Sequence, residues 1–318
     1  MKKLFLLILT LALLLSGCAS QEKTVPVKTD TKILMNTSCT ISADSSKKTI
    51  EGAFNLVAEY ERLVSRNMPD SDVSLINYHN EMEVTPQVYE MLSKAIYYCQ
   101  KSGGKYDITV APVENLYDFS AKKAPTAEDA KKVLYKVGYN RIKLANSSVN
   151  LHSTNINLDS IAKGYTADKV VEYLKNKKAT KIKVQLGNSI AVYGQSHTLK
   201  INKPFGKKNL LSMDIKNTCA ATCSIDDKYF KANGKVYHHI LNAKTGMPVD
   251  NGLAKVIVVG EKATECDVLS TVCLILGEKE GKALINKTKG YEAILVKTNN
   301  KYSVTKGLKV KDGKVTYK

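Results

Sequence analysis

Two common nucleotide-binding signatures are absent from this 318-residue sequence. It contains neither G-x-G-x-x-G nor a Walker A run, the glycine-rich phosphate loops of Rossmann and P-loop proteins. Tryptophan is missing too, and the positive charge comes from scattered lysines rather than from an arginine-rich aromatic platform. The sequence therefore predicts neither nucleotide fold and no nucleic-acid partner.

Cysteines are few and do not follow a metal-binding or disulfide framework. Apart from Cys18, six are present, none in a C-x-x-C pair: Cys39, Cys99, Cys219, Cys223, Cys266 and Cys273. Several lie in apolar runs, where a free thiol behaves as a small hydrophobic side chain. Export would permit disulfides, but we expect free thiols.

Only the N-terminus carries a long apolar run. The start "MKKLFLLILTLALLLSGCAS" has two lysines, an apolar stretch and then small residues, which is typical of a secretory signal. Its end, Leu15-Ser16-Gly17-Cys18, resembles a bacterial lipobox, in which the cysteine is lipidated and becomes the mature N-terminus. More than one acyl chain makes such anchoring durable. The alternative is an ordinary cleaved signal with a chance cysteine.

We therefore expect residues 1–17 to be a lipoprotein signal peptide, 18–32 a polar tether and 33–318 one large domain. The mature protein would lie at the extracytoplasmic face of a bacterial cell membrane. Losing Lys2 and Lys3 with the signal lowers the formal net charge from +18 to +16. That excess favours an anionic membrane surface or a polyanionic ligand.

Helical and strand patterns are mixed along the domain. Apolar spacing and capping residues predict helices over 51–65, 85–103, 126–138, 160–177 and 265–276. Strands are expected over 181–186, 191–194, 254–260, 291–298 and 301–305, with a hairpin turn at Asn233-Gly234. Because this is not a regular βαβ alternation, we expect an α+β fold with antiparallel hairpins.

Two neighbouring histidines, His238 and His239, follow the hairpin turn. Successive side chains of a strand point to opposite faces, so at most one of them belongs to a given site. From these residues alone, a polar step in a strand remains the alternative.

A carboxylate and a hydroxyl lie four residues apart in "TECDVLSTVCLILG". On a helix, Asp267 and Thr271 share one face, and their hard oxygen atoms suit magnesium or calcium. The alternative is a capping box in which Thr264 and Asp267 close the first turn.

Six ordered segments carry a resemblance to a known family: "SRNMPDSDVSLIN", "SGGKYDITVAPVENLYDF", "NLDSIAKGYTADKV", "KVQLGNSIAVYG", "KYFKANGKVYHHILNAKTGMPV" and "ATECDVLSTVCLILG". Together they resemble the FAD:protein FMN transferases, or ApbE-type flavin transferases, over nearly all of the mature chain. The resemblance implies a T-fold-related α+β architecture with FAD in a cleft between two halves. It also implies Mg²⁺ or another divalent cation at the diphosphate. FMN would pass from FAD to a threonine or serine of an exported acceptor, such as a flavoprotein of an electron-transfer chain, with release of AMP.

The resemblance also implies roles for individual residues. Metal ligands would be Asp267, Thr271 and the backbone carbonyl of Ala162. The histidine of the family's His-x-(Ile/Val)-Asp-Pro run matches His239, the expected base, with His238 as its outward neighbour. Expected flavin or adenosine contacts are Met35, Lys105, Tyr106, Asp107, Tyr165 and Leu241. Lys163 would lie near the phosphates, and Asp159 would face the diphosphate.

Several positions depart from the family's usual residues: Asn36, Asn67, Asn157, Asp159-Ser160, Asn188-Ser189, Cys223–Ile225 and Asn242-Ala243. Side chains in place of glycine would narrow the flavin cleft, and Asp159 would repel a diphosphate. Two alternatives therefore stand beside the transferase. One is an FAD pyrophosphatase that yields FMN and AMP, and the other is a catalytically silent flavin-binding lipoprotein.

Overall fold

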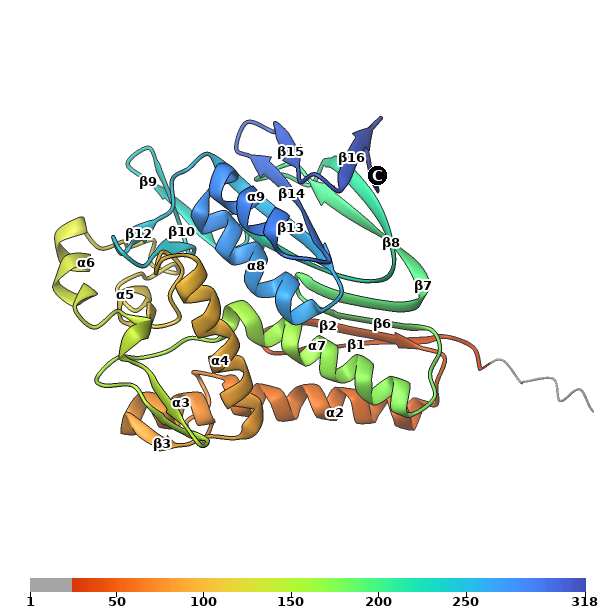
Figure 1. The fold of residues 1–318 in the computed structure, drawn as a ribbon, viewed down its shortest axis with the longest axis horizontal. Helices are drawn as coiled ribbons and strands as arrows, with labels where there is room; N and C mark the ends of the chain where they lie inside the picture. Colours follow the sequence, from red (N-terminus) through yellow and green to blue (C-terminus); the bar gives the residue numbers. More distant parts are fainter. Residues whose placement is uncertain (1–24) are drawn as a thin grey trace, which may run out of the picture.

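A large mixed sheet with helices packed on one face dominates the computed structural model, which describes residues 25–318 (Figure 1). The expected signal peptide and the lipidation site at Cys18 lie outside these residues. No helix of the described part is long and apolar enough to cross a membrane. The expected α+β class with antiparallel hairpins is confirmed.

The main sheet has ten strands, and its central path runs β1-β2-β6-β7-β8-β13-β14-β15. Pairing is antiparallel except where β17 runs parallel to β8. The strands are β1 (Lys28–Leu34), β2 (Thr37–Ala43), β6 (Ile182–Leu186), β7 (Ser189–Asn202), β8 (Asn209–Ser224), β13 (Leu253–Gly260), β14 (Tyr291–Lys297), β15 (Tyr302–Val304), β16 (Leu308–Lys311) and β17 (Lys314–Tyr317).

The five expected helices are present, and shorter elements fill the connections. The helices are α2 (Lys47–Val64), α3 (Asp72–His79), α4 (Pro86–Lys101), α5 (Ala111–Glu114), α6 (Ala127–Leu134), α7 (Asp159–Asn176), α8 (Ala263–Leu276) and α9 (Glu278–Lys287), with a 3₁₀ turn at Tyr139–Arg141. Small strands are β3 (Glu81–Glu83), β4 (Lys143–Ala145), β5 (Ser148–Asn150), β9 (Tyr229–Ala232), β10 (Lys235–His238), β11 (Leu241–Asn242) and β12 (Met247–Pro248). Asn233 and Gly234 both have positive φ, so the expected hairpin turn joins β9 to β10.

The domain begins earlier than expected. Residues 28–32, predicted as part of the tether, form most of β1 and pair with β2. The hydroxyl groups of Thr29 and Ser42 are hydrogen-bonded across this pair at 2.7 Å. β1 is the edge strand of the sheet, and most of its side chains are exposed. Lysines on an edge strand discourage pairing with a strand of another molecule, so its composition resembles that of a solvated linker.

Both faces of the sheet are buried, as β13 illustrates. Val256 and Val258 belong to the core under the helices, whereas Ile257 and Val259 belong to a second core on the opposite face. This explains why the strand is a continuous apolar run rather than an alternation. The six cysteines of the described residues are buried and free, as expected.

The second core exists because the β7–β8 hairpin bends (Figure 1). The register shifts between Val192 and Ser196, and the Gly194 N–H donates to the side-chain oxygen of Asn217 at 2.7 Å. Beyond the bend, Ile201 and Met213 pack with Val259. The outer half of the hairpin therefore folds over the face of the sheet that the helices leave open.

Replacement of Gly194 by alanine should destabilise the protein. Gly194 has φ +67°, and an added Cβ would lie 1.6 Å from the Thr180 carbonyl oxygen. The left-handed conformation alone costs about 1–2 kcal/mol, and the backbone clash adds to this. In urea unfolding, the free energy of unfolding of Gly194→Ala should fall by more than the about 1–2 kcal/mol of the conformational cost alone. Gly206→Ala is the matched control, because its nearest neighbours lie at 3.9 Å; equal stability of the two variants would contradict the constraint.

Candidate active site

A cavity of about 920 Å³ opens where the turn between β1 and β2, the start of α7, the ends of β6 to β8 and helix α8 meet. That volume is at the upper end of the range for pockets that bind drug-sized ligands and cofactors. Nine expected site residues from several different elements line it: Met35, Tyr106, Asp107, Asp159, Lys163, His239, Leu241, Asp267 and Thr271. The fold therefore brings together residues that are as much as 236 positions apart.

Asp267 lies at the contact between α7 and α8. Its Oδ2 accepts a hydrogen bond from the Gly164 N–H at 2.8 Å. A Cβ at Gly164 would lie 2.2 Å from the Ala263 carbonyl oxygen, so only glycine permits this approach. Asp267 is 7% exposed, and burial raises the pKa of its carboxyl group while the Lys163 charge lowers it. The result is a buried carboxylate at the cavity wall.

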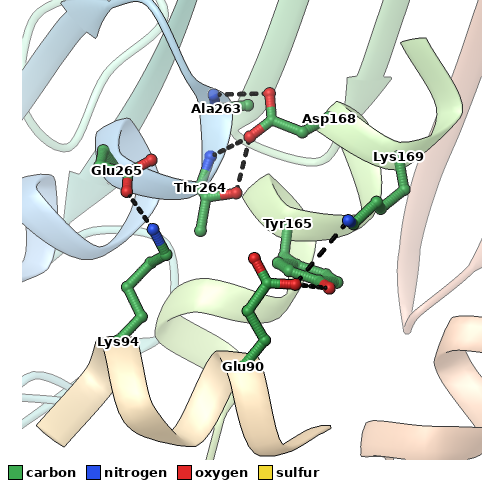
Figure 2. Close-up of polar contacts among 8 residues, drawn as sticks. All are labelled: Glu90, Lys94, Tyr165, Asp168, Lys169, Ala263, Thr264 and Glu265. Carbon is green, nitrogen blue, oxygen red and sulfur yellow. Dashed lines mark hydrogen bonds and ion pairs between the residues drawn. The ribbon is translucent and has the colours of Figure 1, made fainter. Parts of the chain in front are cut away.

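Asp267 does not cap its helix, so the capping-box alternative is wrong. Helix α8 begins after Lys262, and Asp168 of α7 accepts hydrogen bonds from the N–H groups of Ala263 (2.9 Å) and Thr264 (3.0 Å) (Figure 2). The Thr264 hydroxyl also donates to Asp168, at 2.6 Å. A carboxylate that is distant in sequence thus supplies the cap, and Asp267 is left to face the cavity.

The groups around Asp267 suit a hard divalent cation. Thr271, one turn further along α8, lines the same cavity. No hydrogen bond is formed by Asp267 Oδ1 within residues 25–318, and the buried Ser189 hydroxyl beside it has no partner of good geometry there. No group of three His, Cys, Asp or Glu side chains gathers in the described part. A cation would thus depend on hydroxyl and carbonyl oxygens as well as one carboxylate.

Ala162, the third expected ligand, lines a smaller cavity that shares Met35, Asp159 and Lys163 with the main one. Its carbonyl oxygen accepts a hydrogen bond from the Thr166 hydroxyl at 2.8 Å. A carbonyl oxygen has two lone pairs, so further coordination would compete with the bonds it already makes inside α7.

His239 lines the cavity with one ring nitrogen occupied. Its Nδ1 lies 3.1 Å from the Lys228 carbonyl oxygen. Because a carbonyl only accepts, Nδ1 carries the proton and Nε2 keeps a lone pair. Burial lowers the pKa of His239 to about 4. The imidazole is therefore neutral at ordinary pH and can accept a proton at Nε2.

His238 was expected to point outward, and this is wrong. It is 2% exposed, its Nε2–H donates to the Val249 carbonyl at 3.0 Å, and its Nδ1 accepts the Ile240 N–H at 3.3 Å. His238 ends β10 and His239 follows the strand, so the two side chains do point to different sides, but the side opposite the cavity is covered by the chain around Val249. His238 is thus a structural residue with both nitrogens used.

The expected flavin contacts divide into two groups. Met35, Tyr106, Asp107 and Leu241 line the cavity, although the Asp107 carboxylate already accepts bonds from Thr109 and Tyr139.

Lys105 and Tyr165 do not line the cavity. Lys105 pairs with Glu280 of α9 at 2.8 Å. The Tyr165 hydroxyl donates to Glu90 of α4 at 2.5 Å (Figure 2). Contrary to expectation, each of these side chains pairs with a carboxylate of a neighbouring helix and does not line the cavity.

A polar network that the sequence analysis missed forms another part of the wall. The Asn157 amide donates to Glu114 at 2.9 Å, and Arg66 pairs with Glu114 at 3.0 Å. Asn157 Oδ1 also accepts the Asp159 N–H at 2.9 Å, at the start of α7. An amide at position 157 donates to Glu114, whereas an aspartate there would repel it. No local spacing signals this group, because its members come from separate elements.

Two other departures from the family pattern also lie in the cavity wall. Asn188 donates to Asp227 at 2.6 Å, and both line the cavity. Cys223 is buried there as well, and burial raises the pKa of its thiol to about 12. The Cys223 thiol is therefore an uncharged part of the cavity surface.

Comparison with known proteins places the chain in a family. The ApbE family profile matches residues 35–295. The FAD:protein FMN transferase of Haemophilus influenzae is 28% identical over 334 residues, covering 96% of each chain. That of Klebsiella pneumoniae is 28% identical over 257 residues, covering 77% of this chain and 81% of the relative.

Solved structures agree on the fold. The ApbE protein of Thermotoga maritima superposes with a TM-score of 0.81 at 22% identity, covering 88% of this chain and 97% of the other. The flavin transferase ApbE of Vibrio cholerae gives a TM-score of 0.77 at 22% identity, covering 88% and 98%. With the matched family profile and the shared architecture, the chain belongs to the ApbE family.

Proposed function

We propose that the protein transfers FMN from FAD to a threonine or serine hydroxyl of an exported acceptor protein, releasing AMP. One observation carries this proposal. The neutral His239, whose Nε2 can accept a proton, lines the same cavity as Asp267 and Thr271, whose side-chain oxygens could bind a cation. The names of the two bacterial relatives, FAD:protein FMN transferase, point to the same reaction.

His239 acts as the base. A hydroxyl group is a weak nucleophile, and loss of its proton to Nε2 strengthens it as it attacks the phosphorus atom of the FMN half. A new oxygen–phosphorus bond forms to the acceptor, and the bond between phosphorus and the diphosphate bridging oxygen breaks, so AMP leaves. The Lys228 carbonyl holds Nδ1–H and stabilises the imidazolium that forms.

Electrostatics of the cavity favour a cation-assisted reaction. Five carboxylate residues line it, against three cationic ones: Asp107, Glu114, Asp159, Asp227 and Asp267, with Arg66, Lys163 and Lys228. Because carboxylates outnumber cationic side chains, a diphosphate bound in this cavity would be repelled unless further positive charge were present. When bound by Asp267 and Thr271, with the Ala162 carbonyl, a divalent cation such as Mg²⁺ would neutralise diphosphate charge and orient the leaving group. Lys163 and the N-terminus of α7 add positive potential beside it.

The location of the reaction follows from the N-terminal pattern. A lipid on Cys18 would hold the enzyme at the outer face of the cytoplasmic membrane, where exported flavoproteins of electron-transfer chains are its proposed acceptors. Lipidation is tested by mass spectrometry of the mature N-terminus, and the Cys18→Ser variant should lose membrane association.

One assay separates transfer from the alternatives. The purified full-length protein is incubated with FAD, Mg²⁺ and an exported flavin-accepting domain. Covalent flavin fluorescence in a denaturing gel supports the transferase, and it should vanish with EDTA. Free FMN and AMP without labelling would indicate hydrolysis, and the absence of any product would indicate a binding protein.

The two histidines should respond differently to alanine substitution. His239→Ala should slow FMN transfer by about 10²- to 10⁴-fold, because the base is lost. His238→Ala should leave the chemistry largely intact but lower the free energy of unfolding by about 1–3 kcal/mol, because the Val249 carbonyl and Ile240 N–H lose their partner. Steady-state rates and urea unfolding measure the two effects. Equal rate losses in two stably folded variants would remove His239 from its role.

The pH profile should reflect the lowered pKa of His239. Its value of about 4 means that the ring stays neutral far below the usual histidine range. The acid limb of kcat/KM should therefore lie below the ordinary value of about 6.5. Because the unfolded chain binds this proton first, the histidine also lowers folding stability as pH falls from about 6.5 towards 4. An acid limb at or above 6.5 would argue against a buried neutral base.

Asp267→Asn should weaken Mg²⁺ binding without unfolding the protein. Asparagine can still accept from Gly164, but it removes a negative charge from the proposed ligand set. Raised Mg²⁺ should partly restore transfer by mass action, and Thr271→Val should act in the same direction. Asp168→Ala is the control: it removes the helix cap, costing about 0.5–2 kcal/mol of stability, and should leave the Mg²⁺ requirement unchanged. Wild-type transfer by Asp267→Asn at limiting Mg²⁺ would exclude the metal role.

A further inference from the structure

Two loops meet at the cavity rim beside His239. One is the segment 226–229 after β8, whose Lys228 carbonyl holds the His239 ring. The other is the tip of the β7–β8 hairpin, residues 203–208. The Phe205 N–H donates to Asp226 at 2.6 Å. The bend at Gly194 thus carries the hairpin tip back to the residues that orient the proposed base.

An aromatic pair is exposed on this rim. Phe205 and Tyr229 are each about two-fifths exposed, at 38%, and their ring centroids are 5.0 Å apart in an edge-to-face arrangement. Tyr229 is also the strand partner of His238 in the β9–β10 hairpin. Large aromatic side chains that remain accessible beside a functional cavity are typical anchors of protein interfaces.

Lysines without an ion-pair partner gather in the two loops, and the Lys231 Nζ lies 5.8 Å from the Phe205 ring centroid. Five lysines lie in or next to the two loops: Lys203, Lys207, Lys208, Lys228 and Lys231. None of them forms an ion pair within residues 25–318. The two local carboxylates are already engaged, because Asp226 pairs with Lys255 at 2.6 Å and Asp227 accepts from Asn188 at 2.6 Å. The rim therefore presents net positive charge around an apolar centre.

We propose that this rim, residues 203–208 with 226–231, is the docking surface for the acceptor protein. The partner would present an acidic face with a small apolar contact around its threonine or serine. This rests on the proposed transfer reaction, in which an acceptor hydroxyl has to enter the cavity and reach His239. A bilayer seated on the rim would cover that entrance, so the position favours a protein over an anionic membrane.

Two double variants of the full-length protein test the surface. Phe205→Ser with Tyr229→Ser removes the apolar centre, and Lys207→Glu with Lys208→Glu reverses charge at the hairpin tip. With an exported flavin-accepting domain as the probe, each should raise KM for that domain by about tenfold or more, as loss of interface anchors does. The FAD dissociation constant and kcat should change less than about twofold, since none of the four side chains lines the cavity. The charge-reversed variant should also reduce the salt dependence of kcat/KM.

Matched controls lie on exposed sites away from the rim. Tyr97→Ser on α4 removes a side chain that is 50% exposed, and Lys47→Glu with Lys48→Glu reverses two exposed charges at the start of α2. Both should leave KM for the domain unchanged. An equal rise in KM for the controls would show that only the general positive charge of the protein matters, and it would overturn the proposal. An unchanged KM in both rim variants would overturn it as well.

Direct binding separates this proposal from the transferase itself. Binding of the same domain to the FAD-free protein is measured for the wild type and the rim variants. If the wild type binds but does not transfer FMN, loss of binding in the rim variants supports the docking surface while the proposed reaction fails. Unchanged binding overturns the surface. Loss of binding to phosphatidylglycerol vesicles alone, with domain binding retained, would assign the rim to the membrane and also overturn it.

Discussion

The hydrogen bond from the Gly164 N–H to the buried carboxylate of Asp267 determines how α7 and α8 pack. A side chain at 164 would collide with the Ala263 carbonyl, so the two helices approach closely only at glycine. Asp168, one turn further along α7, caps the start of α8. The Gly164 contact holds Asp267 at the cavity wall beside Lys163 and the N-terminus of α7, and the Asp168 cap leaves the Asp267 carboxylate uninvolved in the helix start. A buried carboxylate without a counter-charge is destabilising, because its burial removes hydrating water. A cation bound beside Asp267 would compensate for that cost.

Backbone carbonyls decide what the two adjacent histidines can do. The Lys228 carbonyl accepts a hydrogen bond from His239 Nδ1–H and leaves Nε2 for the cavity. His238 is held at both nitrogens by Val249 and Ile240. Two residues of the same type, one position apart, therefore divide into a candidate base and a packing residue. Burial keeps the His239 ring neutral at ordinary pH, so Nε2 carries no proton there.

The bend in the β7–β8 hairpin links the fold to the entrance of the cavity. Gly194 and Asn217 turn the hairpin over the open face of the sheet, where its outer half completes the second core. That course also brings Phe205 to Asp226, next to the carbonyl that orients His239. Sheet stability and the shape of the rim thus depend on the same turn, and a long hairpin serves both as a core layer and as part of the site's border.

The sequence by itself determined five of the longer helices and the Asn233-Gly234 hairpin, because these follow from local periodicity and turn chemistry. Periodicity also indicated that the two histidines face different sides, but not which of them faces the cavity. Its six ordered segments also indicated the ApbE family. Only the tertiary structure decided that Asp168 caps α8, that His238 is buried, that Lys105 and Tyr165 turn away, and that Glu114 joins Arg66 to Asn157. Local spacing specifies which side chains share a face, but a hydrogen-bond partner or a covering loop can come from any part of the chain. Those pairings are settled only when distant elements pack together.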